Sequence, residues 1–190
     1  MEKYNFGEDA SYLLSCNKLG IETLEQLEIA EAYAFMIRAL EIENGLYRIE
    51  AFTKRDFKAL HRYLFQDIYH FAGEFREVQL SKGNTRFCQF QYIDRMADEI
   101  FGVLHTEGAW QDVSTAAKRL AYFKAELNML HPFREGNGRA TRIFIHAYAR
   151  EKGYEWDYAS LDKNEYMQAM VESVVDTTAL EAIFLKTLHT

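Results

Sequence analysis

Hydrophobic residues recur at steps of three and four along most of the chain, which is the spacing of amphipathic helices. The segments with this pattern are 22–43, 53–69, 92–105, 115–130, 139–150, 164–173 and 178–188. We expect their apolar stripes to form the core, including Tyr33, Ile37 and Leu40 of the first segment. Residues 1–20 mix short apolar pieces with polar side chains and predict an ordered arm rather than a long helix. The pattern predicts a mainly α, compact helical bundle with an all-helical C-terminal part.

One stretch departs from the helical period. Residues 78–80 and 86–90 form two short alternating runs on either side of Lys82-Gly83-Asn84. Alternation around a glycine-containing turn is typical of a β-hairpin. We expect this hairpin to be the only strand pair in the chain. It should lie against the helices, because an isolated two-stranded hairpin is only marginally stable in water.

The connection between helices 115–130 and 139–150 concentrates polar chemistry. The twelve residues His131 to Arg142 include the only proline, two of the ten glycines, a carboxylate and three arginines. Pro132 disfavours the α conformation for the residue before it, so His131 is expected at the C-terminal end of its helix with its side chain in a cleft. The helix C-terminus would raise the basicity of this imidazole.

The glycines of this connection predict an anion site. Gly136, Asn137 and Gly138 tolerate left-handed backbone conformations, and three such residues in a row can gather several N–H groups into one concavity. The helix that follows would direct its N-terminal N–H groups into the same place. Arg139 and Arg142 lie on one face of its first turn, where two guanidinium groups can clamp phosphate oxygens.

Glu135 beside a phosphate site indicates Mg²⁺, which typically uses one or two carboxylates together with phosphate oxygens. The connection contains no serine or cysteine nucleophile, so His131 is better interpreted as the base that activates an incoming hydroxyl. Each feature alone has a commoner structural explanation: a capping histidine, a turn, or solvated arginines. Their coincidence within twelve residues favours a magnesium–nucleotide site.

The segment 131–142 resembles the signature of the Fic family, His-x-Phe-x-(Asp/Glu)-Gly-Asn-Gly-Arg-x-x-Arg, and matches it at every specified position. The resemblance covers roughly residues 45–190 and implies an enzyme that moves AMP from ATP to a Ser, Thr or Tyr hydroxyl of a target protein. The roles that it implies are His131 as base, Phe133 as core anchor, Glu135 as Mg²⁺ ligand, Gly136, Asn137 and Gly138 as anion hole, and Arg139 and Arg142 as holders of the β- and γ-phosphates.

The hairpin is similar to the Fic flap, because Phe-Ala-Gly-x-x-Arg at 71–76 is followed by Ser-Lys-Gly and then Arg-Phe. This resemblance implies that the hairpin lies over the active site and docks the target segment by strand addition. The residues that would dock the target are Ser81, Lys82, Gly83 and Asn84. Lys82 is also a candidate contact to the nucleotide. Asn128, one turn before His131, is another candidate for ATP binding and is equally open to a structural role.

Many Fic proteins are held inactive by a helix with the motif (Ser/Thr)-x-x-x-Glu-(Gly/Asn), whose Glu pairs with the second signature arginine, here Arg142. The segment that ends in Glu43-Asn44 lacks the hydroxyl residue, and the segment that contains Glu181 lacks the final Gly or Asn. The chain thus resembles the toxin class that is inhibited by a small separate antitoxin. The alternative is that Glu43 acts as a degenerate internal brake. For the site itself, the alternatives are phosphoryl or other nucleotidyl transfer, and nucleotide binding without turnover.

Length and composition limit the remaining possibilities. With 190 residues we expect one domain, made of an arm and helix over 1–45 and a core over 46–190. The net charge of −7 disfavours nucleic acid as a partner. Cys16 and Cys88 have no metal-type spacing. No apolar run approaches the roughly 18–20 residues that span a membrane, and the N-terminus lacks the apolar stretch of a signal peptide. We therefore expect a cytoplasmic enzyme, with a secreted effector that bypasses the usual signal as the alternative.

Overall fold

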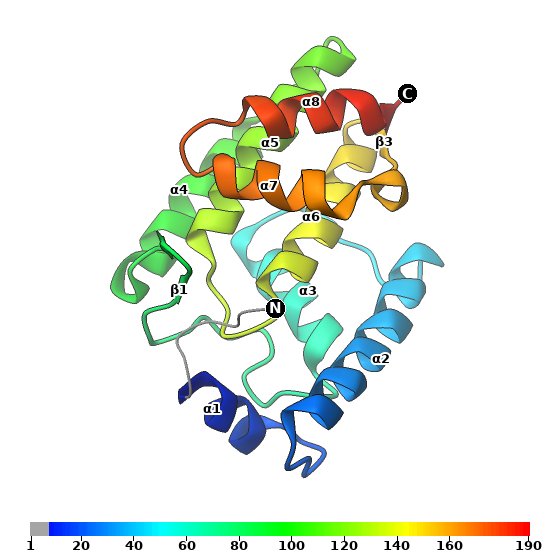
Figure 1. Ribbon diagram of the computed structural model, residues 1–190. Coiled ribbons are helices and arrows are strands. Elements are labelled where there is room, and N and C mark those ends of the chain that lie inside the picture. The colour runs from blue at the N-terminus through cyan, green and yellow to red at the C-terminus, as the bar shows by residue number, and fades with distance from the viewer. Residues whose placement is uncertain (1–7) are drawn as a thin grey trace.

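The computed structural model describes residues 8–190, and this part of the chain is mainly helical, as predicted (Figure 1). Its helices are α1 (Glu8–Cys16), α2 (Leu24–Glu43), α3 (Lys54–Phe65), α4 (Ile93–Thr106), α5 (Val113–Leu130), α6 (Asn137–Glu151), α7 (Lys163–Glu172) and α8 (Thr178–Thr187). Two 3-10 turns complete the helical part, η1 (Phe90–Tyr92) and η2 (Tyr158–Ser160). The predicted N-terminal arm thus contains the short helix α1. None of these helices combines the length and hydrophobicity that crossing a bilayer requires.

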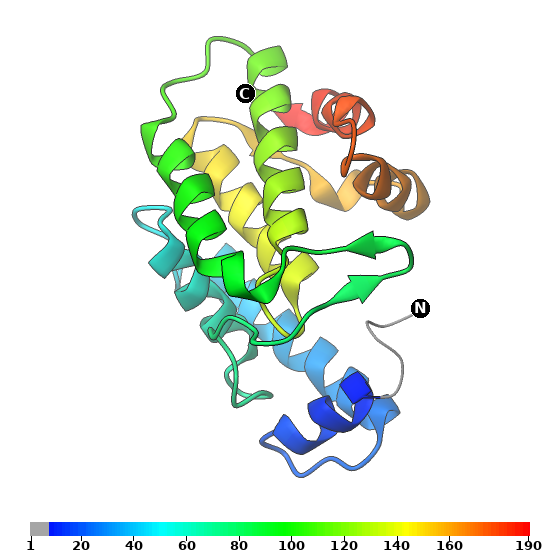
Figure 2. The ribbon, with the colours of Figure 1, turned by 90° about the vertical axis from the view of Figure 1, so that its left-hand side faces the viewer.

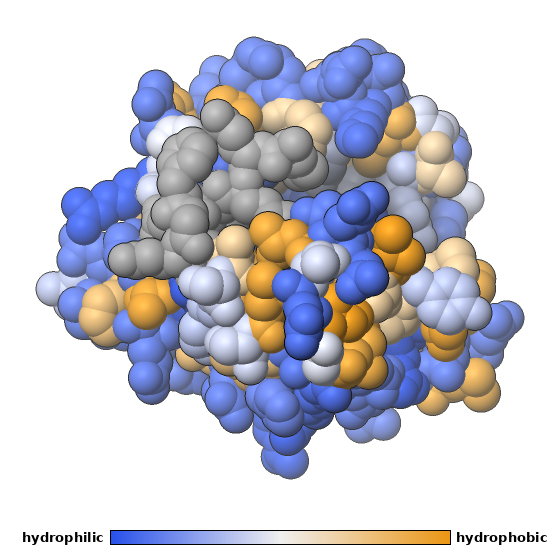
Figure 3. Space-filling view, turned by 60° about the horizontal axis from the view of Figure 1, so that its bottom comes forward, coloured by the Kyte–Doolittle hydropathy of each residue, from blue (hydrophilic) through white to orange (hydrophobic). Residues whose placement is uncertain are grey.

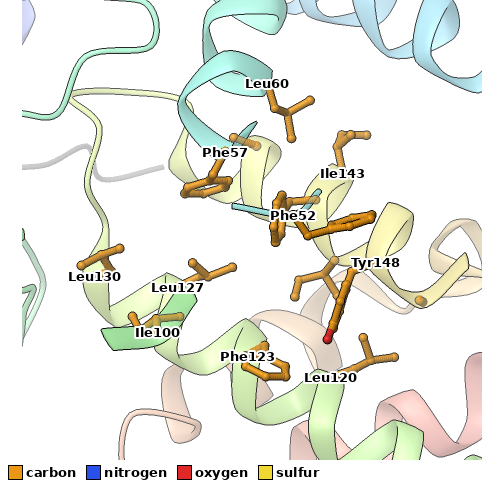
Figure 4. Packing of buried hydrophobic residues seen from close by; sticks show 14 of the residues in the cluster. Phe52, Phe57, Leu60, Ile100, Leu120, Phe123, Leu127, Leu130, Ile143 and Tyr148 are labelled. Atoms are coloured by element: carbon orange, nitrogen blue, oxygen red, sulfur yellow. The ribbon is translucent and has the colours of Figure 1, made fainter. Parts of the chain in front are cut away.

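Helix α5 forms the centre of the core. It packs against α4, α6 and α8, and small side chains on its surface let these neighbours approach closely. The alanines of α5 that are buried in this way are Ala116, Ala117, Ala121 and Ala125. Larger side chains from several helices fill the remaining space (Figure 4). Those labelled in Figure 4 are Phe52, Phe57, Leu60, Ile100, Leu120, Phe123, Leu127, Leu130, Ile143 and Tyr148.

Helix α3 ends earlier than the sequence pattern predicts. It begins at a capping box, in which Thr53 and Asp56 exchange side-chain and backbone hydrogen bonds. It stops at Phe65 rather than at residue 69, because the next residues pair with the N-terminal segment. The N–H of Lys18 donates to the carbonyl of Ile68, and that of His70 donates to Cys16. Long-range backbone pairing has here replaced the last helical turn.

The predicted hairpin is present, but its strands are shorter than expected. β1 (Ser81–Lys82) pairs with β2 (Thr85–Arg86) in antiparallel register, with Ser81 opposite Arg86. Figure 2 shows the hairpin as a narrow arm that projects from the helices. Of the predicted runs 78–80 and 86–90, only Arg86 belongs to a strand. One backbone hydrogen bond, from the N–H of Phe87 to the carbonyl of Leu80, and one from Nε2 of Gln79 to the carbonyl of Phe87 hold these runs together.

The prediction that this hairpin is the only strand pair is wrong. β3 (Glu155–Trp156) pairs with β4 (Leu188–His189), so the C-terminal part is not entirely helical. The pairing fastens the end of the chain to the segment after α6, and the indole N–H of Trp156 donates to the hydroxyl of Thr187. Two strands of two residues each, far apart in the sequence, leave no periodic signal by which they could be predicted.

The expectation that the whole apolar stripe of α2 is buried is also wrong. Leu27 is buried against the core, whereas an entire face of the helix remains exposed to solvent. The large hydrophobic residues on this face are Ile29, Tyr33, Met36, Ile37 and Leu40. A similar mixture of hydrophobic and hydrophilic surface is visible in Figure 3, which looks at the end of the molecule at the bottom of Figure 1. Helix α2 is apolar on two faces, and helical periodicity alone does not say which of them meets the core.

Candidate active site

His131 stands at the point where α5 ends. Its backbone is in the left-handed conformation, with φ of 41°, and its N–H still donates to the carbonyl of Leu127. The imidazole turns back towards the helix, with Nδ1 3.0 Å from the carbonyl oxygen of Asn128. Because a carbonyl only accepts, Nδ1 carries the proton and the lone pair lies on Nε2. The backbone of Asn128 therefore fixes the tautomer that a base requires.

The surroundings of His131 differ from the sequence prediction in one important respect. Its side chain is not open in a cleft, since the residue is only 4% exposed and its ring stacks on that of Phe87 at 3.7 Å between centroids. Burial lowers the pKa of His131 to about 3, and the positive charges of Arg76 and Lys82 act in the same direction. The expected increase in basicity is wrong, because desolvation outweighs the helix C-terminus.

Gly136 directly precedes α6 as its N-cap residue and is the one residue of the predicted nest with a positive φ, 79°. A Cβ at this position would lie 2.5 Å from two ring carbons of Phe65, so only glycine fits. Asn137 and Gly138 already belong to the first helical turn, which corrects the predicted start of this helix at Arg139. No side chain caps α6, so its N-terminal N–H groups present the kind of helix end that suits an anion.

The side chain of Asn137 stabilises the loop through two hydrogen bonds to the backbone of Phe133. Its Oδ1 accepts from the N–H of Phe133 at 2.8 Å, and its Nδ2 donates to the carbonyl of Phe133 at 2.7 Å. Phe133 is fully buried, as expected of a core anchor. Its ring stacks on that of His61 at 3.7 Å between centroids. Asn137 and Phe133 together fix the shape of the loop between α5 and α6.

His61 is a site residue that the sequence analysis missed. It lies on α3, is fully buried, and has Nε2 2.8 Å from the carbonyl oxygen of Glu135, while Nδ1 accepts from the N–H of Gly73 at 2.9 Å. Both ring nitrogens are satisfied only by the neutral imidazole. Burial lowers its pKa to about 3. The sequence feature that could have indicated its role is a histidine within the apolar stripe of a helix.

The first signature arginine is engaged by two carboxylates. Nη2 of Arg139 lies 2.6 Å from Glu31 of α2 and 3.4 Å from Glu135. Its guanidinium also lies over the rings of Phe35 and Phe65. Both carboxylate contacts use Nη2, which leaves the donors on Nε and Nη1 for a ligand. Glu31 was not predicted, because it reaches the site from a helix outside the signature.

The second signature arginine has different surroundings. The guanidinium carbon of Arg142 lies 5.7 Å from the ring centroid of Tyr158, and its Nε is buried without a hydrogen-bond partner. Glu43 contacts Arg150 instead, at 2.9 Å. The alternative in which Glu43 acts as an internal brake on Arg142 therefore has no supporting contact among residues 8–190.

Arg76 joins the hairpin to the signature loop and is the third residue, after His61 and Glu31, to which the sequence analysis gave no role at the site. It is buried, and Nε donates to the carbonyl of His131 at 2.8 Å. Its two terminal nitrogens donate to the carbonyls of Val78 and Cys88, one on each side of the hairpin. The hairpin base is thereby held over His131. Lys82 is close enough for its charge to act on that imidazole.

The arrangement is suited to Mg²⁺ only if phosphates supply most of the ligands. No group of three or more His, Cys, Asp or Glu side chains able to hold a metal ion occurs in the described part of the chain. Glu135 supplies one carboxylate, and its Oε1 accepts from the N–H of Gly136 at 2.8 Å. A single carboxylate at the anion-binding end of α6 fits an ion that arrives with a nucleotide.

Comparison with known sequences identifies the family. A sequence model of the Fic/DOC family matches residues 51–149. The chain is 37% identical over 174 residues to the probable protein adenylyltransferase Fic of Escherichia coli K12, a match that covers 90% of this chain and 85% of that protein. It is 38% identical over 182 residues to the probable protein adenylyltransferase y4lH of Sinorhizobium fredii, covering 91% and 92% of the two chains.

Solved structures show the same fold. The BepC protein of Bartonella tribocorum, crystallised with bound AMPPNP, superposes with a TM-score of 0.81 over 91% of each chain at 19% identity. A Fic domain from Bartonella quintana with bound ADP gives a TM-score of 0.82 at 21% identity, over 91% of this chain and 89% of that one. From the family match, the two sequence relatives and the shared helical fold, we conclude that the chain belongs to the Fic/DOC family.

Proposed function

We propose that the protein is a protein adenylyltransferase, which moves AMP from ATP to a Ser, Thr or Tyr hydroxyl of a target protein. The observation that carries the proposal is that one short loop joins His131, whose lone pair is on Nε2, to the uncapped N-terminus of α6. A base beside an anion-binding helix end suits attack of a hydroxyl on a phosphate. The relatives named protein adenylyltransferases support the same chemistry.

In this reaction the hydroxyl oxygen of the target forms a bond to the α-phosphorus of ATP. The bond from that phosphorus to the bridging oxygen breaks, and pyrophosphate leaves. Nε2 of His131 accepts the proton of the hydroxyl, which requires a neutral imidazole at the start. Burial beneath Phe87 keeps His131 neutral at pH 7.

The phosphates would be held by backbone and side chains of α6. The N–H groups of Gly138 and its neighbours face the N-terminus of the helix, where they stabilise negative charge. Arg139 and Arg142 would hold the β- and γ-phosphates. Glu135 would hold Mg²⁺, which neutralises phosphate charge when it is bound. In this reading Asn128 contributes through its backbone carbonyl, and a contact of its side chain with ATP stays a prediction.

The hairpin would position the target. Ser81, Lys82, Gly83 and Asn84 form its tip, and an extended target segment can add to its strand through backbone hydrogen bonds. Such docking selects a backbone shape rather than a particular side chain, so varied targets are accommodated. The proximity of Lys82 to His131 supports a placement of the acceptor hydroxyl beside the base.

The decisive experiment incubates the purified protein and a bacterial lysate with ATP labelled at either the α- or the γ-phosphate, with Mg²⁺ present. Protein labelling from the α position alone supports AMP transfer. Labelling from the γ position indicates phosphoryl transfer, and labelling from neither indicates a nucleotide-binding module. His131→Ala should abolish labelling while sparing ATP binding, and His105→Ala, an exposed histidine on α4, is the matched control.

We propose further that the enzyme is a toxin inhibited by a separate small antitoxin. The support is negative evidence within residues 8–190, where no complete inhibitory motif occurs and Glu43 pairs with Arg150 rather than with Arg142. In such a pair the antitoxin supplies the glutamate that reaches Arg142. Isolation of the chain with a small protein encoded beside it, and loss of transfer in that complex, would support the pairing.

We also propose that residues 1–190 act as one domain. One continuous hydrophobic core includes residues from Leu13 of α1 to Leu188 of β4. An arm that shares a core with the rest of the chain is expected to unfold with it. A single cooperative transition in urea, followed by two spectroscopic probes, would agree with this proposal.

A further inference from the structure

Lys124 is an unusual residue in the centre of the fold. It lies on α5 and is only 2% exposed, although lysine is almost never fully buried without a partner. Its Nζ lies 5.8 Å from the ring centroid of Tyr166 on α7. Burial, and to a smaller extent the positive charge of Arg142, lowers the pKa of Lys124 to about 7. Among the residues that the structure describes, no carboxylate lies within ion-pair distance of Lys124.

Lys124 and Arg142 lie on the packed helices α5 and α6, and Arg142 is close enough for its charge to act on Lys124. The signature loop joins these two helices, and each residue lies one to two turns from it, so both are at a similar height. The groups that surround the pair are aromatic: Tyr166 of α7 beside Lys124, and Tyr158 of η2 beside Arg142. The phenol of Tyr158 is 3.5 Å from Glu43, whose carboxylate is already bound by Arg150.

Two neighbouring cations without a counterion are costly in a low-dielectric interior. The cost is a local destabilisation that an arriving anion relieves, so such a pair strengthens anion binding more than a solvated pair does. The unpartnered Nε of Arg142 adds a buried donor to the same place. Because Lys124 is only 2% exposed and its Nζ lies near the ring of Tyr166, it is placed to act on an anion through Arg142 rather than by touching it.

We propose that Lys124 is a positioning residue for the terminal phosphate of ATP: its charge repels the guanidinium of Arg142 towards the phosphate site and increases the positive potential there. The inference rests on the proposed function, since it takes Arg142 to be the γ-phosphate ligand. It adds a specificity determinant from outside the signature loop. As a consequence of this charge, the protein should bind a nucleoside triphosphate more tightly than the monophosphate.

The test measures equilibrium binding of Mg–ATP and of AMP in the His131→Ala background, where transfer does not consume ATP. Lys124→Met, which keeps the length of the side chain and removes the charge, should weaken ATP binding roughly tenfold. AMP binding should change less than about twofold, because AMP lacks the terminal phosphate. Lys118→Met, on the exposed side of the same helix, is the matched control and should leave both affinities unchanged.

The pH dependence distinguishes a charge effect from a packing effect. Protonated Lys124 favours the anion, so the preference for ATP over AMP should decrease as pH rises from 6 to 8.5 through the pKa of about 7. The charged and titratable groups that face Lys124 are Arg142 and Tyr166, and neither changes charge in this range. In Lys124→Met this part of the pH dependence should vanish, while titration of the phosphate itself is common to both proteins.

A double-mutant cycle tests whether Lys124 acts on ATP binding through Arg142. If Lys124 acts through Arg142, then Lys124→Met should have little further effect on ATP binding once Arg142→Met is present. Equal weakening of ATP and AMP by Lys124→Met, or an unchanged ratio, would overturn the inference while leaving the transfer activity intact. Absence of ATP binding in the parent protein would overturn the proposed function itself.

Discussion

Glu31 of α2 reaches into the signature loop and binds Nη2 of Arg139 at 2.6 Å. The same carboxylate accepts a hydrogen bond from the phenol of Tyr69, so one buried acid links α2, α6 and the segment after α3. The desolvation of a buried carboxylate is offset only when such partners are present. Arg139 is therefore held in place before any phosphate arrives, which reduces the ordering that nucleotide binding requires.

The first prediction concerns this contact. Glu31→Ala should reduce the free energy of unfolding by about 2–3 kcal/mol, because it leaves the Tyr69 hydroxyl and the partly exposed Arg139 without their buried acceptor. Urea unfolding measures the change. Lys186→Ala breaks an exposed ion pair with Glu165 and is the control, with an expected change within about 0.5 kcal/mol. Equal effects of the two substitutions would show that Glu31 is not a structural link.

The second prediction concerns the acid side of the pH–rate profile. With a pKa of about 3, His131 stays neutral and should not titrate between pH 5.5 and 8. Phe87→Ala removes the ring that buries it, so the pKa should rise towards 6.5 and transfer should decline below that pH. NMR titration of the histidines measures the shift directly. Tyr92→Ala, an exposed aromatic residue of η1, should leave the His131 titration unchanged.

The third prediction compares two glycines of the signature loop. Gly136→Ala should destabilise the protein by more than about 1 kcal/mol, because φ is 79° and the added Cβ meets Phe65. Gly138→Ala meets nothing within 4 Å, and in the first turn of α6 it should preserve or slightly increase stability. Thermal unfolding separates the two. A stable Gly136→Ala protein would mean that the loop can adopt another conformation.

How much of this site the sequence could predict depends on the range of the interactions. The signature loop and its helices are local, and their residues could be assigned from order and spacing alone. The burial of His131 could not be predicted, because the stacked Phe87 comes from the hairpin segment, which Arg76 holds through the carbonyl of the neighbouring Cys88. Likewise, helical periodicity does not distinguish the two apolar faces of α2. Only packing against the rest of the chain determines that Leu27 is buried and Tyr33 exposed.

The fourth prediction concerns stability in mild acid. His61 has a folded pKa of about 3 and an unfolded value near 6.5, so the unfolded state binds the proton first. Its contribution is fully present above pH 6.5 and is lost as pH falls, by about 2 kcal/mol between pH 7 and pH 5. His61→Gln offers one donor and one acceptor at similar reach and should flatten the decline. His105→Gln, an exposed control on α4, should keep the wild-type slope of unfolding free energy against pH.

The last prediction concerns Glu43. Its carboxylate binds Arg150, a pair at the surface that contributes little to stability, and it makes no contact with Arg142. Glu43→Gly should therefore leave AMP transfer by the isolated protein within about twofold of the wild-type rate, since no γ-phosphate position is released. The rate is followed with α-labelled ATP, beside Glu41→Gly as a control on the same helix. If activity appears only in Glu43→Gly, the glutamate is an internal brake after all, and the chain does not depend on a separate antitoxin.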